Sequence, residues 1–191
     1  MKTMQHDLAT GWVERLQRGD QSVFDEIFDA LNPRLLGFLE RMTRQRSVAE
    51  DLAEETWLRL VSSARSLRPD TNLVAWLYTV ARNLFVGHLR ARVREQAYTS
   101  EWLSLWPDEV ARGPYEEAAS NEFERRLERA LGALPATYRE VLLLVGMEGL
   151  RPMEAAQVCG ISAEALRQRL SRARQMLEQT LQQQEGRQES L

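Results

Sequence analysis

The fold of this chain is decided by SVAEDLAEETWLRL (47–60), by the polar segment SSARSLRPDTN (62–72) and by LVAWLYTVARNLFVGHLRARVR (73–94). Apolar residues recur in the first and third segments at the spacing of amphipathic helices, and Pro69 interrupts that pattern in the middle segment. The first segment is rich in acids, whereas the third begins with aromatic and apolar residues and ends in arginines. This order predicts two helices with different surfaces, joined by a polar loop.

The rest of the chain also has the pattern of helices. Proline and glycine are sparse, and no run alternates as a half-buried strand would. The other expected helices are 7–18, 22–31, 33–44, 122–134, 137–147, 152–158 and 163–181. Pro33 is expected to separate the second of these from the third, because proline suits the first turn of a helix and not its interior. The sequence predicts an all-α protein.

Two helical blocks are separated by a segment of different composition. Residues 98–119 contain Pro107, Gly113 and Pro114 and have little periodicity, as a linker would. We therefore expect two small helical domains joined by a flexible linker. Their expected bounds are 1–96 for the first domain, 97–119 for the acidic linker, 120–182 for the second domain and 183–191 for a polar tail.

Composition argues against several classes of protein. The chain of 191 residues has no apolar run near the ~20 residues that cross a bilayer. Its N-terminus lacks an apolar signal core and its single cysteine, Cys159, cannot form an internal disulfide, so we expect a cytoplasmic protein. Two histidines far apart in sequence, His6 and His88, give no metal-ligand set, and no phosphate-binding glycine loop or nucleophile elbow appears. We expect no enzyme, no metal and no cofactor.

The net charge of -3 conceals a segregation of charge along the chain. Residues 76–96 and 162–175 each hold four arginines against one glutamate, whereas residues 101–124 hold seven acids against one arginine. Basic blocks separated by an acidic block indicate two contact surfaces and a spacer.

The acidic segment has two faces. Ser47 and Glu50 have the spacing of a helix-capping box, and Leu52, Thr56 and Leu60 are expected to face the core. A second stripe, at helical spacing, consists of Asp51, Glu54, Glu55 and Leu58. It is either a docking surface for a basic partner or a row of acids that only caps and solubilises a surface helix.

The basic helix and the loop before it suggest contact with nucleic acid. Aromatic residues beside arginines are typical of surfaces that stack unpaired bases and follow the phosphate backbone. Trp76, however, is spaced as a core residue, so the contacts are expected from polar side chains. On the helix and in the loop these are Ser63, Arg65, Arg68, Asn72, Arg82, Asn83, His88 and Arg90.

The last two expected helices resemble a helix-turn-helix. Gly160 can supply the tight turn and Ser162 the cap of the second helix. Arginine reads guanine and glutamine reads adenine in the major groove, and such a motif places its second helix there. The expected contacts are Glu164, Arg167, Gln168, Ser171, Arg172 and Arg174. An ordinary helical hairpin with a solvated charged face is the alternative.

Four segments in this order resemble the successive motifs of bacterial extracytoplasmic-function (group 4) sigma factors of the sigma-70 family. They are AEDLAEETWLRL (49–60), AWLYTVARNLFVGHLR (75–90), LPATYREVLLL (134–144) and ISAEALRQRLSRAR (161–174). The resemblance covers residues 20–181 and implies a sigma-2-like helical bundle followed by a sigma-4-like helix-turn-helix domain. Gly87 stands where many members carry aspartate, and Ala165-Leu166-Arg167 replaces the usual Thr-Val-Lys.

The resemblance also implies partners and roles. The acidic stripe would dock on the clamp helices of the largest subunit of core RNA polymerase, and the polymerase flap would be a further contact. The loop with the basic helix would read the -10 promoter element and trap an unpaired base, and the final helix would read the -35 element. An anti-sigma factor is an expected partner as well.

Two other functions remain open on the sequence. A stand-alone homodimeric helix-turn-helix regulator would bind duplex DNA without entering polymerase, but it has no use for the 47–94 segment. A sigma-like decoy would keep the acidic helix without sequence-specific DNA contact, and Arg167 and Arg172 argue against it.

Overall fold

The computed structural model describes residues 11–97 and 121–188, and within these ranges all regular structure is helical. The first domain consists of α2 (Trp12–Gln17), α3 (Gln21–Thr43), α4 (Arg46–Ser63), the 3-10 turn η1 (Ala64–Ser66) and α5 (Leu73–Ala97). The second consists of α7 (Glu122–Ala133), α8 (Ala136–Leu142), the π turn η2 (Leu143–Met147), α9 (Pro152–Cys159) and α10 (Ala163–Gln188). The all-α prediction is confirmed, and nearly all of the predicted linker lies outside the described residues.

The predicted break at Pro33 is wrong. Residues 21–43 form one continuous helix with Pro33 inside it. A proline in a helix interior costs about 3 kcal/mol because it removes a hydrogen bond and crowds the preceding turn. Buried residues continue on both sides of the proline, among them Leu31 and Leu35. Asn32 also accepts a hydrogen bond from Trp57 Nε1 of α4 at 2.9 Å, so packing on the neighbouring helix outweighs the local preference.

Helix α4 begins earlier than the predicted capping box. Its N-cap is Gln45, which makes no capping bond with its side chain, and the helix includes Arg46 and Ser47. Arg44 ends α3 in the left-handed region at φ 58°, so the chain turns directly into α4. Glu50 pairs with Arg46 at 2.8 Å instead of capping the helix. The expected core face of α4 is present, since Thr56 and Leu60 are fully buried.

The helix-turn-helix has the predicted local geometry. Gly160 ends α9 in the left-handed region at φ 64°, a conformation that favours glycine. Ser162 Oγ accepts a hydrogen bond from Ala165 N at 3.1 Å and so caps α10. Helix α10 extends to Gln188, farther than the sequence pattern indicated.

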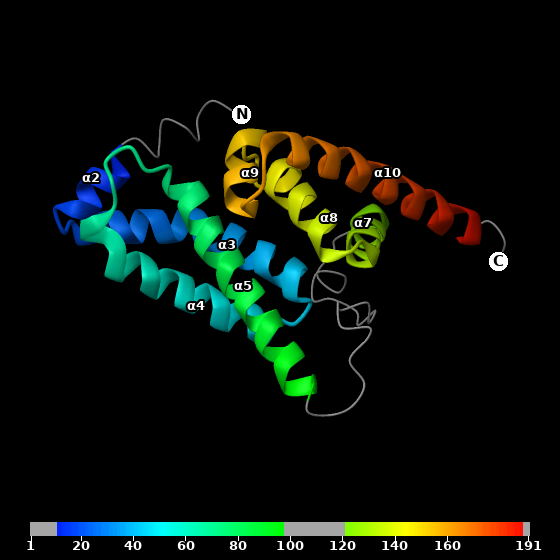
Figure 1. The fold of residues 1–191 in the computed structure, drawn as a ribbon, viewed down its shortest axis with the longest axis horizontal. Helices are drawn as coiled ribbons and strands as arrows, with labels where there is room; N and C mark the ends of the chain where they lie inside the picture. Colours follow the sequence, from blue (N-terminus) through cyan, green and yellow to red (C-terminus); the bar gives the residue numbers. More distant parts are fainter. Residues whose placement is uncertain (1–10, 98–120, 189–191) are drawn as a thin grey trace.

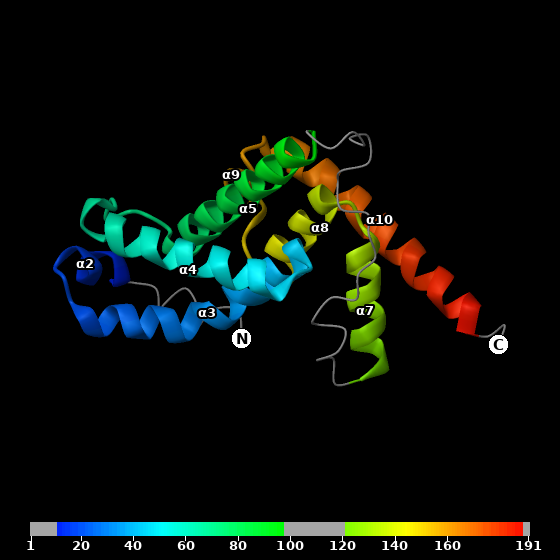
Figure 2. The ribbon, with the colours of Figure 1, turned by 90° about the horizontal axis from the view of Figure 1, so that it is seen from below.

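The two domains lie against each other. Helices α5 and α3 face the second domain, with α9 alongside α5 and α8 near α3 (Figure 1). Helix α4 lies on the side of the first domain away from α8–α10, and α10 projects away from the body of the molecule (Figures 1 and 2). The docking helix predicted from sequence is therefore on one side of the molecule and the helix-turn-helix on the other.

A buried arginine joins the ends of several helices. Arg139 is 2% exposed, and its guanidinium donates to the carbonyl oxygens of Leu131, Gly132 and Leu134 at 2.9–3.0 Å. It also donates to the carbonyl oxygen of Arg41 near the end of α3 at 2.9 Å. Helix C-termini leave carbonyl groups that need donors from outside the helix, and the Arg139 guanidinium donates to those of both domains, while Arg44 also donates to the Gly132 carbonyl oxygen.

We predict that Arg139→Lys lowers the free energy of unfolding by roughly 3 kcal/mol, because one ammonium cannot reach all these carbonyls and leaves buried acceptors unpaired. Urea unfolding followed by circular dichroism measures the change. Arg125→Lys, on the partly exposed face of α7, is the matched control and should be close to neutral. Equal stability of the two variants would contradict the structural role of Arg139.

A carboxylate fixes the start of α3. Asp20 accepts hydrogen bonds from Ser22 N at 3.0 Å and from Arg15 Nε at 2.8 Å. The Ser22 hydroxyl and then the Arg15 guanidinium lower the pKa of Asp20 from 3.8 to about 2. The folded state therefore favours the ionised carboxylate, and its contribution is present above the unfolded-state pKa and is lost as pH falls through the folded-state pKa.

We predict that Asp20→Asn lowers the free energy of unfolding at neutral pH and that its deficit against wild type shrinks between about pH 4 and pH 2. Asparagine still caps a helix, so the difference isolates the charge. Denaturant titrations at a series of pH values give the deficit. Asp25→Asn, at an exposed carboxylate within α3, is the matched control.

Candidate nucleic-acid interface and docking surfaces

Helix α4 exposes a mixed acidic and apolar stripe. Asp51 and Glu54 are exposed, and Glu55 is half-exposed and paired with Arg59 at 2.9 Å. Leu58 is 56% exposed, and Val61 on the next turn is 57% exposed. Exposed apolar side chains beside acids on one face indicate a contact surface for another molecule. Val61 was not among the residues predicted from sequence, although its position three residues after Leu58 places it on the same stripe.

The loop after α4 is held at its centre. Leu67 is buried, and its carbonyl oxygen accepts a hydrogen bond from Gln17 Nε2 at 2.5 Å. Around this anchor Arg65 is exposed, and Arg68 pairs with Asp70 at 2.9 Å. Ser63 is the last residue of α4 and is half-buried. The loop therefore exposes Arg65 and Arg68 on either side of the anchored residue Leu67.

The predicted -10 residues do not form one patch. Asn72 caps α5 through a hydrogen bond from Ala75 N to its Oδ1 at 3.1 Å. From Asn72 to Arg90 the helix advances about 27 Å, at ~1.5 Å per residue. Asn83 and Arg90 are exposed, His88 is half-buried, and Arg82 is turned toward the second domain.

Arg82 is engaged by the second domain. Its Nε lies 2.8 Å from an oxygen of Glu140, a carboxylate that is 3% exposed. Burial and the charge of the neighbouring Glu140 raise the pKa of the Cys159 thiol to about 12, so this cysteine is a packed thiol and not a thiolate. Glu140 could not be predicted from sequence, because nothing local marks a buried acid whose partner is 58 residues away.

A second buried acid joins the domains. Glu148 follows the π turn, and its carboxylate accepts a hydrogen bond from the Tyr78 hydroxyl and pairs with Arg34 Nε at 3.1 Å. Burial raises the pKa of Glu148, and the Tyr78 hydroxyl and the Arg34 guanidinium partly offset this effect. Burial, followed by the negative charge of Glu148, raises the pKa of Tyr78 as well, so the phenol stays protonated and donates.

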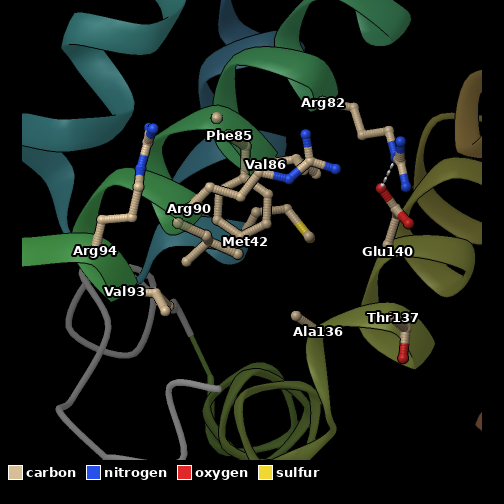
Figure 3. A pocket seen from close by; sticks show the side chains of 12 residues that line it. Met42, Arg82, Phe85, Val86, Arg90, Val93, Arg94, Ala136, Thr137 and Glu140 are labelled. Atoms are coloured by element: carbon tan, nitrogen blue, oxygen red, sulfur yellow. Dashed lines mark hydrogen bonds and ion pairs between the residues drawn. The ribbon is translucent and has the colours of Figure 1, made fainter. Parts of the chain in front are cut away.

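An open groove of about 830 Å³ runs beside the Arg82–Glu140 pair (Figure 3). Its floor is apolar, with Met42, Phe85 and Val86 among its residues. Arg90 and Arg94 line the groove from α5, and Ala136 and Thr137 line it from α8 (Figure 3). The groove shows that the domains meet closely at Arg82 and diverge toward the end of α5.

The predicted -35 residues share one exposed face. Glu164, Arg167, Gln168, Ser171, Arg172 and Arg174 are all exposed on α10. Leu166, Leu170 and Ala173 on the opposite face are buried, which fixes the rotation of the helix. Glu164 orders the start of this face, with an oxygen 2.5 Å from Arg167 Nη2, and this hydrogen bond lowers the pKa of Glu164. The structure thus brings this set together as the sequence predicted.

Comparison with known proteins identifies both halves of the chain. Residues 27–95 match the model of Sigma-70 region 2, and residues 124–177 match that of Sigma-70, region 4. The sigma factor EcfG of Rhodopseudomonas palustris strain TIE-1 is 34% identical over 160 residues, covering 82% of this chain and 83% of EcfG. The chain belongs to the extracytoplasmic-function sigma factors of the sigma-70 family.

Two further relatives agree with this assignment. The sigma factor CarQ of Myxococcus xanthus is 32% identical over 169 residues, covering 88% of this chain and 95% of CarQ. The structure of the sigma factor RpoE in complex with the anti-sigma factor NepR from Bartonella quintana superposes with a TM-score of 0.69 at 29% identity. That match covers 83% of this chain and 96% of RpoE.

The family assignment confirms the predicted function class. This sigma factor directs transcription initiation, and its fold is the predicted pair of small helical domains, called region 2 (27–95) and region 4 (124–177) below. Within residues 11–97 and 121–188, no helix is both long enough and apolar enough to span a membrane.

Proposed function

We propose that this sigma factor binds core RNA polymerase through α4, reads the -10 element with the loop and α5, and reads the -35 element with α10. The observation that carries the proposal is the coexistence on one chain of an exposed acidic–apolar stripe and an exposed helix-turn-helix face. A stand-alone regulator would need only the second of these surfaces. The domain bounds 1–96, 97–119, 120–182 and 183–191 belong to the same proposal.

The docking surface on α4 combines two kinds of contact. Asp51, Glu54 and Glu55 supply negative charge that would steer the helix toward a basic partner. Leu58 and Val61 supply apolar area that gains free energy only when a partner covers it, at roughly 25 cal/mol per Å². We assign this surface to contact with the clamp helices of the largest polymerase subunit, and we assign contact with the polymerase flap to region 4.

On the -10 element, region 2 would act by differential binding. The loop residues Ser63, Arg65 and Arg68 lie at one end of α5, near Asn72, and Asn83, His88 and Arg90 lie along it. Contacts made only with an unstacked strand offset the few kcal/mol that unstacking costs, and this favours a melted promoter. Arg82 joins this set once it is released from Glu140.

The proposal also covers catalysis, the place of action and a further protein partner. The chain itself carries no catalytic step, because the polymerase supplies the chemistry of RNA synthesis. Its place of action is the cytoplasm, where the polymerase and the promoter are. The solved complex of RpoE with NepR supports an anti-sigma factor as a further partner of this chain.

We predict that Leu58→Glu/Val61→Glu reduces binding to core polymerase by at least about tenfold, because two exposed apolar contacts of roughly 1 kcal/mol each are replaced by charges. Fluorescence anisotropy of the labelled sigma factor with core polymerase measures affinity, and run-off transcription measures initiation. The template is a promoter selected from genomic fragments by the reconstituted holoenzyme. Phe123→Glu, at a side chain on α7 that is 64% exposed, is the matched control.

Unchanged affinity of the double variant would remove α4 from the docking surface. If wild type shifts duplex DNA alone but never supports initiation, the homodimeric regulator is the better description.

We predict that Arg172→Ala weakens open-complex formation on the selected promoter by about tenfold, equivalent to one base or phosphate contact of 1–3 kcal/mol. The loss should be smaller on a template whose -35 element is scrambled, because a contact that is not made cannot be removed. Filter binding of holoenzyme at several salt concentrations provides both values. Arg18→Ala, an exposed arginine at the opposite end of the molecule, should leave both templates unaffected. An equal loss on the two templates would mean that Arg172 does not act at the -35 element.

A further inference from the structure

A row of polar contacts crosses from region 4 to region 2. Among the described residues, three ion pairs join the regions: Arg34–Glu148 at 3.1 Å, Arg41–Glu128 at 2.7 Å and Arg82–Glu140 at 2.8 Å. Asn72 Nδ2 also donates to Glu154 at 2.9 Å, and the Tyr78 hydroxyl donates to Glu148. In each of these contacts the carboxylate comes from region 4 and the donor from region 2. Region 4 therefore presents four glutamates to donors of region 2, beside Arg139, which donates to the carbonyl oxygen of Arg41.

Two of these carboxylates contact residues that are assigned above to promoter DNA. Glu140 occupies Arg82, and Glu154 occupies Asn72. A carboxylate and a phosphate offer the same kind of acceptor to a guanidinium or an amide. Glu140 and Glu154 therefore use the donors that the acceptor groups of a DNA strand would need.

The three ion pairs are integrated into the packing, whereas the Asn72–Glu154 contact is exposed. Glu140 is 3% exposed and Glu148 is 9% exposed, and the side chains of Arg41 and Glu128 are each 12% exposed. Carboxylates are seldom so buried without specific partners, because removal from water is costly. A loose encounter of two domains would leave these groups hydrated, so the structure describes a specific closed state.

The closed state is too compact to hold both promoter elements. Two promoter elements read by different regions are separated along the duplex by ~3.4 Å for each intervening base pair, so the regions must lie apart to read both. In the structure α5 touches region 4 itself, and a domain of this size is roughly 28 Å across, which bounds the distance to the outer face of α10. The 23 residues from 98 to 120 could span about 80 Å when extended, so the covalent connection permits the required separation.

We propose that region 4 is an intramolecular competitor of -10 DNA, whose Glu140 and Glu154 occupy Arg82 and Asn72 until the domains separate. The consequence for DNA rests on the proposed function, which assigns Arg82 and Asn72 to the -10 element. Helix α4 lies on the side of region 2 away from α8–α10 (Figure 1), and the side chains of Asp51, Glu54 and Leu58 are exposed in the closed state. Polymerase can therefore dock on the closed chain, and promoter capture follows opening.

The test holds the domains together reversibly. Arg41→Cys/Glu128→Cys places two thiols at the α3–α7 contact, and neither residue belongs to a proposed DNA or polymerase surface. A short bis-maleimide with an internal disulfide joins them, and a reductant later cleaves the bridge. Cys159 is buried with its thiol pKa raised to about 12, so it reacts slowly. The matched control, Arg125→Cys/Arg129→Cys, receives the same bridge within α7 alone.

We expect the bridged α3–α7 protein to bind core polymerase as wild type does but to initiate at least about tenfold less run-off transcript, a shift of ~1.4 kcal/mol. Reductant should restore initiation, and the bridged control should initiate normally throughout. Full initiation by the bridged α3–α7 protein would overturn the proposal. Failure of the unbridged protein to initiate would instead contradict the sigma function, so the two failures are distinguishable.

A second measurement tests closure without DNA or polymerase. Glu128→Arg places like charges at the α3–α7 contact, and we expect small-angle X-ray scattering to show a larger radius of gyration than for wild type. The swapped pair Arg41→Glu/Glu128→Arg should restore the compact value, with circular dichroism showing that each variant is folded. The same radius for all three proteins would show that this contact does not hold the domains together.

Discussion

The burial of one continuous apolar stripe along α3 is the constraint on which the other elements depend. The stripe runs past Pro33, and covering it requires α4 and α5 to pack on the same helix. The rotation of α3 is thereby fixed, and Arg34 and Arg41 are directed to region 4. The same rotation places the α4 stripe on the opposite side of region 2. One packing requirement thus separates the proposed docking surface from the face that meets region 4.

Local features of this chain were readable from sequence because their causes are local. The turn at Gly160, the caps at Ser162 and Asn72 and the exposed face of α10 follow from side-chain chemistry within a few residues. The break predicted at Pro33 was wrong for the converse reason. A proline inside a helix carries a local cost in free energy, but contacts between residues far apart in the sequence outweigh it. One of them is the hydrogen bond from Trp57 to Asn32, which lie 25 positions apart. Ser47 failed as a cap because α3 ends too close to it.

The contacts between the domains could not be read from sequence at all. Arg82 looked like a free DNA-binding arginine, and Glu140 lay within an apolar helix with no local sign of its partner. Nothing in a period or a spacing relates residues 34 and 148, which lie 114 positions apart. The charge blocks gave no such signal, because the glutamates of the three ion pairs, at 128, 140 and 148, lie outside the acidic block 101–124. Which glutamate meets which arginine depends on helix rotation, and therefore on the core.

The chemistry of the interface suits a contact that must open. An ion pair taken from water gives little net free energy, because the cost of desolvation offsets most of the attraction. Separation of Arg82 from Glu140 returns both groups to water or to DNA, so breaking this pair costs little net free energy. Closure through buried polar pairs is specific because unmatched charges are costly, and it is reversible because matched ones gain little. A factor that must release its own DNA-reading arginine needs both properties.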